Sequence, residues 1–340
     1  MKKGLWWGCF AVVVLTGLLL VIFRGSVLPE RFDGDAQSIV TATEMLREDP
    51  GAEHIDRYYT NSAKVFLALG VADKPMVVGI VGYLIVVGLV LFTVRGGKGG
   101  WAELSTIGVV LALSAVYLGT FSKDIFGVIL VAGPLIIGQR KGWGIWAGAG
   151  GAVVFGLVFR PYYVVVALLA LGYYLIWKLL RPRMWQWVAL LTMTVVAGVV
   201  GYFVVTGMDI SAVREVNNLD REATSKVINI VEPGGIGAGI VNSLMVGGMM
   251  LVPVPLFLAG SMYHVLSGLL MMGLVIFVIG LVRDSNLRVR ASAGLSILMA
   301  LFVVQCLFEP DLGSVLRHWT MLGAVLIMAW YIMKEKYEQA

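Results

Sequence analysis

The stretch Phe308–Trp319 reads FEPDLGSVLRHW and separates two apolar runs, each long enough to cross a bilayer. Within a dozen residues it holds four ionisable side chains, namely Glu309, Asp311, Arg317 and His318. A link this short needs no such density of charge to stay soluble. We therefore interpret 308–318 as a loop that carries functional side chains, and the rest of the chain as a scaffold that brings other charges to it.

Similar apolar runs recur along the whole chain. Of its 340 residues, 59% are hydrophobic and 14% are charged, against roughly 25% charged in soluble domains. The sequence therefore predicts an all-α fold, a polytopic transmembrane helical bundle that forms a single domain over residues 1–340. The first run, 5–23, follows two lysines but no small-residue cleavage site follows it, so we expect a retained first helix rather than a signal peptide.

The basic residues predict the orientation of the spans, because cytoplasmic loops carry an excess of Lys and Arg. This rule places both termini in the cytoplasm and two longer segments, 24–75 and 207–262, on the outer face. Within 237–262 the sequence Val252-Pro253-Val254-Pro255 interrupts the apolar run, and proline breaks a helix. We therefore expect a re-entrant or interfacial segment there. About ten spans result, at approximately 5–23, 76–94, 104–120, 125–138, 143–159, 162–179, 185–206, 263–282, 290–307 and 319–333.

Several function classes are disfavoured by composition. The formal charge of +5 comes from cations dispersed among loops, so no nucleic-acid partner is predicted. Cys9 and Cys306 both lie in apolar runs and lack metal-ligand spacing. The chain has neither a glycine-rich phosphate loop after a strand nor a G-x-S-x-G motif.

Cations on the outer face are the feature that the positive-inside rule does not explain. Arginine binds phosphate oxygens with a bidentate fork, so several such groups around one outward-facing cavity would suit a diphosphate. The alternative is that each cation lies at the interface and contacts lipid head groups. The set comprises Lys123, Arg160, Arg214, Arg221, Lys226, Arg317 and His318.

Acidic and basic groups that transfer protons are also present on this face. Asp33 and Asp35, with one glycine between them, predict either a cation site, a general base or simply an acidic turn. His318 is a candidate proton acceptor near neutral pH, or a structural histidine at the interface. Asp124 follows Lys123 directly, which also fits an ion pair at the start of a helix.

The order of short motifs along the chain resembles that of bacterial polysaccharide polymerases of the O-antigen (Wzy) type. The resemblance covers most of the chain and rests on Phe121-Ser122-Lys123-Asp124, Phe159-Arg160-Pro161-Tyr162, a charged outer loop with Arg221 and Ser225, Pro253-Val254-Pro255, and Glu309-Pro310-Asp311-Leu312-Gly313-Ser314 with Arg317-His318. It implies a multi-pass inner-membrane glycosyltransferase, similar to the GT-C class, with its active site facing the periplasm. Such enzymes move a growing glycan from undecaprenyl diphosphate to the non-reducing end of an incoming lipid-linked unit.

The resemblance also implies roles for particular residues. Arg160, Arg221 and Arg317 would hold the diphosphates, with Lys123 and Arg214 beside them. His318, or a carboxylate such as Asp35 or Asp124, would deprotonate the acceptor hydroxyl. No metal or other cofactor is implied. The implied partners are the lipid-linked oligosaccharide, membrane lipids and a chain-length regulator.

Three alternatives stay open. The first outer segment is long and acidic for this family, which is more typical of glycosyltransferases that use a polyprenyl monophosphate sugar and an aspartate base. A flippase or transporter of lipid-linked oligosaccharide would need charged groups deep within several spans, and the spans here are almost purely apolar. An assembly protein without catalytic activity is the third alternative.

Overall fold

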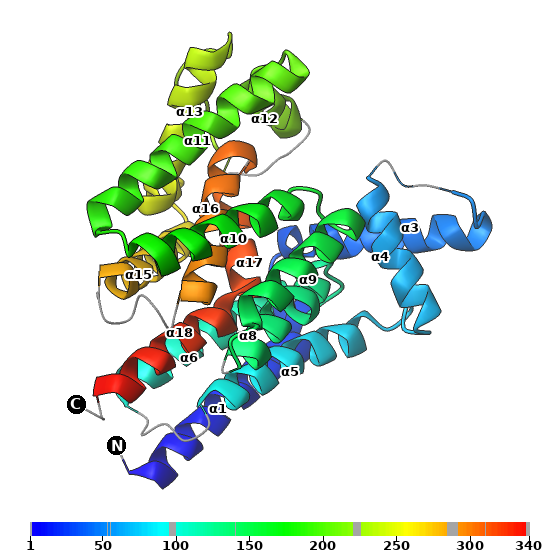
Figure 1. Cartoon of the computed structure of the whole chain (residues 1–340). Helices are drawn as coiled ribbons and strands as arrows, with labels where there is room; N and C mark the ends of the chain where they lie inside the picture. Colours follow the sequence, from blue (N-terminus) through cyan, green and yellow to red (C-terminus); the bar gives the residue numbers. More distant parts are fainter. Residues whose placement is uncertain are drawn as a thin grey trace. The chain divides into compact units, whose positions relative to one another are not determined.

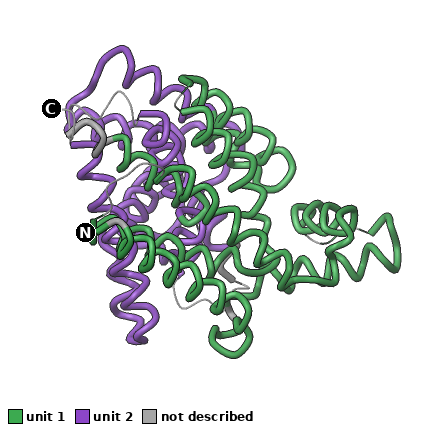
Figure 2. Tube along the Cα trace, turned by 90° about the horizontal axis from the view of Figure 1, so that it is seen from below, with its two compact units in different colours: residues 1–167, 320–340 green, residues 168–319 purple. Residues whose placement is uncertain are grey.

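The computed structural model describes residues 2–52, 54, 56–94, 100–139, 141–219, 226–283, 292–309 and 311–337, and these form helices with their connections (Figure 1). The chain divides into two compact units, which Figure 2 distinguishes by colour. Unit 1 comprises residues 1–167 and 320–340, and unit 2 comprises residues 168–319.

Unit 1 contains the N-terminal helices and the last one. In chain order they are α1 (Lys3–Ile22), α2 (Arg24–Val27), the 3-10 turn η1 (Glu30–Asp33), α3 (Gly34–Glu48), α4 (Arg57–Ala68), α5 (Pro75–Val94), α6 (Trp101–Tyr117), α7 (Asp124–Gly127), the π-helical turn η2 (Val128–Ala132), α8 (Gly133–Gln139), α9 (Gly144–Val158) and α18 (Gly323–Tyr337).

Unit 2 contains the remaining helices, and α10 (Tyr163–Leu180) and α17 (Leu312–Met321) each cross the division between the units. Between them lie α11 (Met184–Thr206), α12 (Ile210–Leu219), α13 (Ile236–Leu251), α14 (Val254–Leu258), α15 (Met262–Arg283) and α16 (Ser292–Phe308). In addition, Lys226 and Asp311 form an isolated antiparallel bridge.

Small residues allow the helices of unit 1 to pack closely. A Cβ added at Gly151 of α9 would lie 1.6 Å from the Leu130 carbonyl oxygen, so only glycine fits against the π-helical turn. The Tyr83 hydroxyl of α5 donates to the Val14 carbonyl of α1 over 3.0 Å. Each of α1, α5 and α6 packs against the other two, so these three helices form one mutually packed group.

The helices confirm the all-helical class, and their length and apolar composition are compatible with a polytopic membrane protein. Among the described residues, five helices are long and apolar enough to cross a membrane, or six if the bent pair α17–α18 is one span. The five are α1, α5, α10, α11 and α15. Four of the five shorter apolar helices match other predicted spans, for example α9 at Gly144–Val158 against 143–159. The fifth, Ile236–Leu251, lies where a re-entrant or interfacial segment was predicted. The count of ten spans and their orientation stay predictions.

Both segments that were predicted to lie on the outer face contain regular structure. The segment 24–75 includes α3 and α4, which pack against each other as a helical pair. The predicted interruption near Pro253 is also present, because α13 ends at Leu251 and α14 begins at Val254.

The segment 308–318 was predicted as a loop, and this is wrong for most of its length, because α17 begins at Leu312. Asp311 caps this helix, since its Oδ1 accepts a hydrogen bond of 2.8 Å from the Ser314 amide. Four apolar residues at helical spacing then bury one face of α17, namely Leu312, Val315, Leu316 and Trp319.

Candidate functional site

The first candidate site lies in unit 1 and is built around Arg160, in the link between α9 and α10. Its Nε and Nη2 donate to Asp124 Oδ1 and Oδ2 over 3.0 and 3.3 Å, which is a bidentate pair. Its Nη1 donates to the Tyr162 hydroxyl over 3.1 Å, and its Nη2 lies 3.8 Å from Asp35 Oδ2. The structure therefore brings together three residues predicted for the site, Asp35, Asp124 and Arg160.

This pairing is buried. The exposed fraction of the side chain is 0% for Asp124, 9% for Arg160 and 13% for Asp35. Burial acts to lower the pKa of the Arg160 guanidinium, but the Asp124 carboxylate, the Tyr162 hydroxyl and the Asp35 carboxylate more than offset it, and the pKa lies well above its usual value. The neighbouring acidic groups thus hold the guanidinium in its charged form.

Helix α4, from the 24–75 segment, completes the cluster. The Tyr59 hydroxyl donates to Asp35 Oδ1 over 2.7 Å, and Lys123 Nζ lies 3.8 Å from the centre of the Tyr59 ring. Lys123 Nζ also lies 3.7 Å from Asp56 Oδ2. We call these six residues the Arg160 cluster: Asp35, Asp56, Tyr59, Lys123, Asp124 and Arg160.

The charge balance of the Arg160 cluster bears on the predicted diphosphate site. Two cations face three carboxylates among its members, so the ionised cluster carries one net negative charge. The guanidinium fork of Arg160, which would bind phosphate, already holds Asp124. The arrangement therefore favours a role in holding the 24–75 segment to the rest of unit 1. Of the two carboxylates in contact with Arg160, Asp35 is the more exposed.

The two neighbouring aspartates of the first outer segment have separate partners. Asp33 Oδ1 accepts a hydrogen bond of 2.6 Å from Arg24 Nε, whereas Asp35 contacts Arg160 and Tyr59. Across the part of the chain that the structure describes, no group of three or more His, Cys, Asp or Glu side chains is placed to hold a metal ion. The geometry therefore gives no support to a joint cation site at Asp33 and Asp35.

The second candidate site lies in unit 2, where α16 ends and α17 begins. His318 Nδ1 lies 3.0 Å from Glu309 Oε2 and 3.3 Å from Gln305 Nε2. Gln305 Oε1 in turn accepts a hydrogen bond of 2.8 Å from Trp319 Nε1. We call these four residues the His318 cluster: Gln305, Glu309, His318 and Trp319.

The carboxylate determines which nitrogen of His318 carries a proton. A proton on Nδ1 would be donated to Glu309 Oε2, 3.0 Å away, and this tautomer would place the basic lone pair on Nε2. His318 is 1% exposed and Glu309 5% exposed, so the pair lies in a water-poor environment that strengthens its hydrogen bond. A carboxylate that orients and supports a histidine is the arrangement of a general base.

The other cations of unit 2 differ in exposure. Arg214 is 1% exposed, and its Nη2 donates to the Cys306 and Leu307 carbonyls over 3.0 Å each, so it caps the end of α16. Burial lowers the pKa of Arg214 to about 10. Arg317 on α17 and Lys226 are partly exposed. Arg221 lies outside the described residues.

Sequence reasoning gave no role to Glu309, Gln305 or Tyr59. Gln305 lies near the end of α16 and Glu309 directly follows this helix, four residues later, a spacing that puts both on one face. That pattern was a usable signal. Tyr59 offered none, because its partner Asp35 is 24 residues away on another helix.

Neither a protein-family model, nor a curated protein, nor a solved structure matches this chain. Its function is therefore inferred from the geometry of the two clusters.

Proposed function

We propose that the protein is a membrane glycosyltransferase that polymerises lipid-linked oligosaccharide repeat units at the outer, periplasmic face of a bacterial inner membrane. The observation that supports this most is the His318–Glu309 pair, with 3.0 Å between Nδ1 and Oε2. It supplies an oriented base, and Arg317 supplies a partly exposed cation one residue away in the chain.

In this proposal His318 Nε2 takes the proton from a hydroxyl at the non-reducing end of the incoming unit. The hydroxyl oxygen then forms a bond to the anomeric carbon of the growing glycan. The bond between that carbon and the diphosphate oxygen breaks, and undecaprenyl diphosphate leaves with the electron pair. General-base catalysis contributes typically about 10²–10⁴-fold to such a step.

Arg317 stabilises the charge that develops on the departing diphosphate. Its guanidinium presents donors in a planar fork, which matches phosphate oxygens, and a site that excludes water strengthens the interaction. Arg221 keeps its predicted role as a second phosphate ligand. Arg160 and Arg214 act instead as structural cations, since Asp124 and the end of α16 respectively occupy their donors.

The second candidate function is transfer of a single sugar from a polyprenyl monophosphate, with Asp35 as the base. It is favoured by one observation, namely that Asp35 is the most exposed carboxylate in contact with Arg160 and accepts a hydrogen bond from Tyr59. The product separates the two candidates. A polymerase makes a ladder of glycan lengths, whereas this transferase adds one sugar.

Replacement of His318 by asparagine tests the proposal. Asparagine keeps a side-chain N–H that can donate to Glu309 but has no basic nitrogen, so we expect the glycan ladder to disappear while the amount of protein in the membrane stays normal. The measurement is the glycan profile of a strain whose own gene is replaced by the variant.

His264→Asn is the matched control. His264 is also buried, but its Nδ1 lies 2.6 Å from the Ser261 hydroxyl at the start of α15, far in sequence from the His318 cluster. We expect this variant to make a full ladder. A full ladder from His318→Asn would rule out the proposed base.

A further inference from the structure

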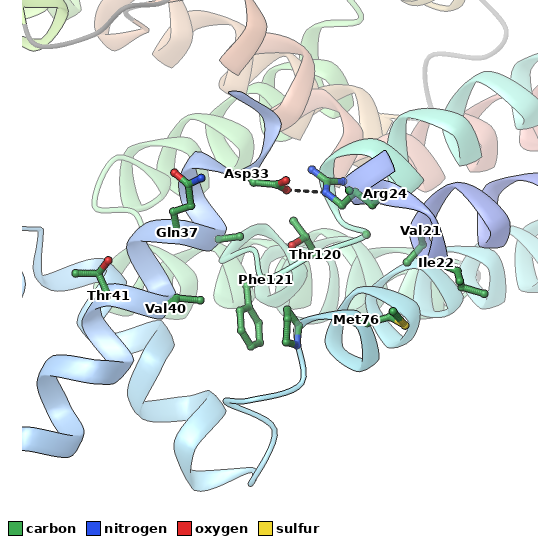
Figure 3. A pocket seen from close by; sticks show the side chains of 14 residues that line it. Val21, Ile22, Arg24, Asp33, Gln37, Val40, Thr41, Met76, Thr120 and Phe121 are labelled. Atoms are coloured by element: carbon green, nitrogen blue, oxygen red, sulfur yellow. Dashed lines mark hydrogen bonds and ion pairs between the residues drawn. The ribbon is translucent and has the colours of Figure 1, made fainter. Parts of the chain in front are cut away.

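A cavity of about 460 Å³ lies entirely within unit 1, where α1 ends and α5 begins (Figure 3). Its volume is within the range of about 300–1,000 Å³ that is usual for ligand sites. Figure 3 shows Gln37, Val40 and Thr41 of α3 on one side, and Val21, Ile22 and Met76 on the other. Neither the Arg160 cluster nor the His318 cluster lines it.

Among the described residues that line the cavity, the one ion pair joins Arg24 to Asp33, and the Arg24 guanidinium also donates hydrogen bonds to backbone carbonyls. Arg24 Nε donates to Asp33 Oδ1, and Nη2 donates to the Phe32 carbonyl over 3.0 Å. Nη1 donates to the carbonyl oxygens of Ala115 and Val116, in the last turn of α6. Arg24 is 7% exposed. Every nitrogen of its guanidinium therefore has an acceptor within the protein, and the cavity offers no guanidinium for a phosphate.

The remaining polar groups of the cavity are those that recognise hydroxyls. The Asp33 carboxylate lines the wall, and 27% of its side chain is exposed, so it can accept further hydrogen bonds. Gln37 and Thr41, both exposed, add an amide and a hydroxyl group, which both donate and accept. An uncharged polyol satisfies this set, whereas an anion would face the Asp33 carboxylate.

The apolar part of the wall fits the same ligand class. Phe121 is 1% exposed and Val21 2% exposed, so they form a fixed floor, while Ile22, Val40 and Met76 are among the exposed large hydrophobic residues of the chain. A sugar ring presents C–H groups on its faces and hydroxyls at its edge. Such a ligand can contact apolar side chains and polar groups at the same time.

We propose that this cavity binds a neutral sugar of the lipid-linked glycan. The inference rests on the proposed function only for the source of that sugar. Its position next to the ends of two apolar helices, α1 and α5, would let the lipid part of the same molecule stay in the membrane.

The test measures binding without catalysis. The full-length protein in lipid nanodiscs is mixed with a panel of neutral methyl glycosides, and saturation-transfer difference NMR detects which of them bind. We expect a signal from at least one glycoside, no displacement by inorganic pyrophosphate, and no displacement by phosphoethanolamine. The absence of a saturation-transfer signal from every glycoside would overturn the proposal. Displacement by phosphoethanolamine would also overturn it and would indicate that the cavity binds a lipid head group.

Two variants locate the signal in the cavity. Gly25→Leu adds a bulky side chain to the cavity wall, where a Cβ meets no atom within 4 Å. The pair Gln37→Leu with Thr41→Val removes hydrogen-bonding groups from an exposed helix face. We expect each to weaken glycoside binding at least tenfold. Gly8→Leu is the matched control, because Gly8 of α1 is equally open but lies outside the cavity.

Undiminished binding in both cavity variants would contradict the proposal. The result is independent of the polymerase assay. If glycosides bind in the cavity but His318→Asn still makes a full ladder, the proposed catalytic base fails and the sugar site stands.

Discussion

The Arg160 cluster and the His318 cluster both bury ionisable side chains, but they differ in whether the central side chain is of a type that can gain or lose a proton. In the Arg160 cluster the central cation is an arginine, which stays charged at any pH that a cell meets, and two carboxylates neutralise it. In the His318 cluster the central group is a histidine, the side-chain type whose unperturbed pKa lies closest to neutral pH. The first is therefore suited to hold parts of unit 1 together, and the second to transfer protons.

The comparison teaches that a buried charge alone does not mark an active site. Removing one partner of a closed ion pair leaves an uncompensated charge, so the damage appears first in stability. Replacing a base by a group of similar shape leaves the packing intact, so the damage appears first in rate. The following experiments use this difference.

The largest effect on stability is expected from Arg160→Leu. Asp124, which is fully buried, would lose its bidentate partner, and we expect a loss of about 3–5 kcal/mol in the free energy of unfolding. Thermal unfolding of the purified protein measures it. The double variant Arg160→Leu with Asp124→Leu removes both charges and should recover much of this loss.

Arg47→Leu serves as the control for that experiment. Arg47 pairs with Asp73 over 2.7 Å, but the two side chains are 45% and 73% exposed, so we expect a change within about 1 kcal/mol. If Arg160→Leu is as harmless as Arg47→Leu while polymer formation is lost, then Arg160 acts on substrate and the structural role assigned to it is wrong.

An intermediate effect is expected from Glu309→Gln. Glu309 is a positioning residue that acts through His318, so we expect the turnover number to fall about 10–100-fold, as with other orienting partners of a functional histidine, while the Michaelis constant changes little. Glu309→Asp, which keeps the carboxylate, should recover part of the rate. Equal rates for the two variants would show that the carboxylate does not support His318.

The smallest effect is expected at Asp209, which joins the link after α11 to Gly234 and Gly235. Partial burial acts to raise the pKa of Asp209, but hydrogen bonds from Ser211 and the two glycine amides lower it overall. A carboxyl whose pKa is depressed on folding contributes stability above its unfolded pKa of about 3.9, and this is lost as the pH falls through the folded value.

Hydrogen exchange of residues 226–235 measures this effect. Below about pH 4 we expect faster exchange there than the intrinsic pH dependence predicts. Asp209→Asn should produce the same local increase at neutral pH, with little change in the His318 cluster. An unchanged exchange rate in Asp209→Asn would show that these hydrogen bonds do not hold the link.

Much of the fold was readable from the sequence, because apolar runs determine where helices form in a membrane protein. The run predicted at 185–206 is α11, and Gly207 ends it with a φ of 72°, a conformation that favours glycine. The segment 308–318 was wrongly predicted as a loop because its density of charged residues was given more weight than the helical spacing of its apolar residues. Leu312, Val315, Leu316 and Trp319 already displayed a helical face, and Asp311 a cap.

The candidate site was less predictable, because its contacts join residues that are distant in the chain. Arg160 and Asp124 are 36 residues apart, and no local pattern relates them. Conversely, two residues that are close in the chain have different partners: Asp33 pairs with Arg24, whereas Asp35 contacts Arg160. His318 and Glu309 were visible as charged residues, but the distance that makes them a pair comes from the turn between α16 and α17.

Reconstitution tests the central claim most directly. The purified protein in lipid vesicles is supplied with an undecaprenyl-diphosphate-linked repeat unit, and the lengths of the products are measured with and without a chelator. We expect a ladder of glycan lengths in both conditions from the wild type, and none from His318→Asn. Addition of a single sugar from a polyprenyl monophosphate donor, with no ladder from the diphosphate-linked unit, would contradict the proposal.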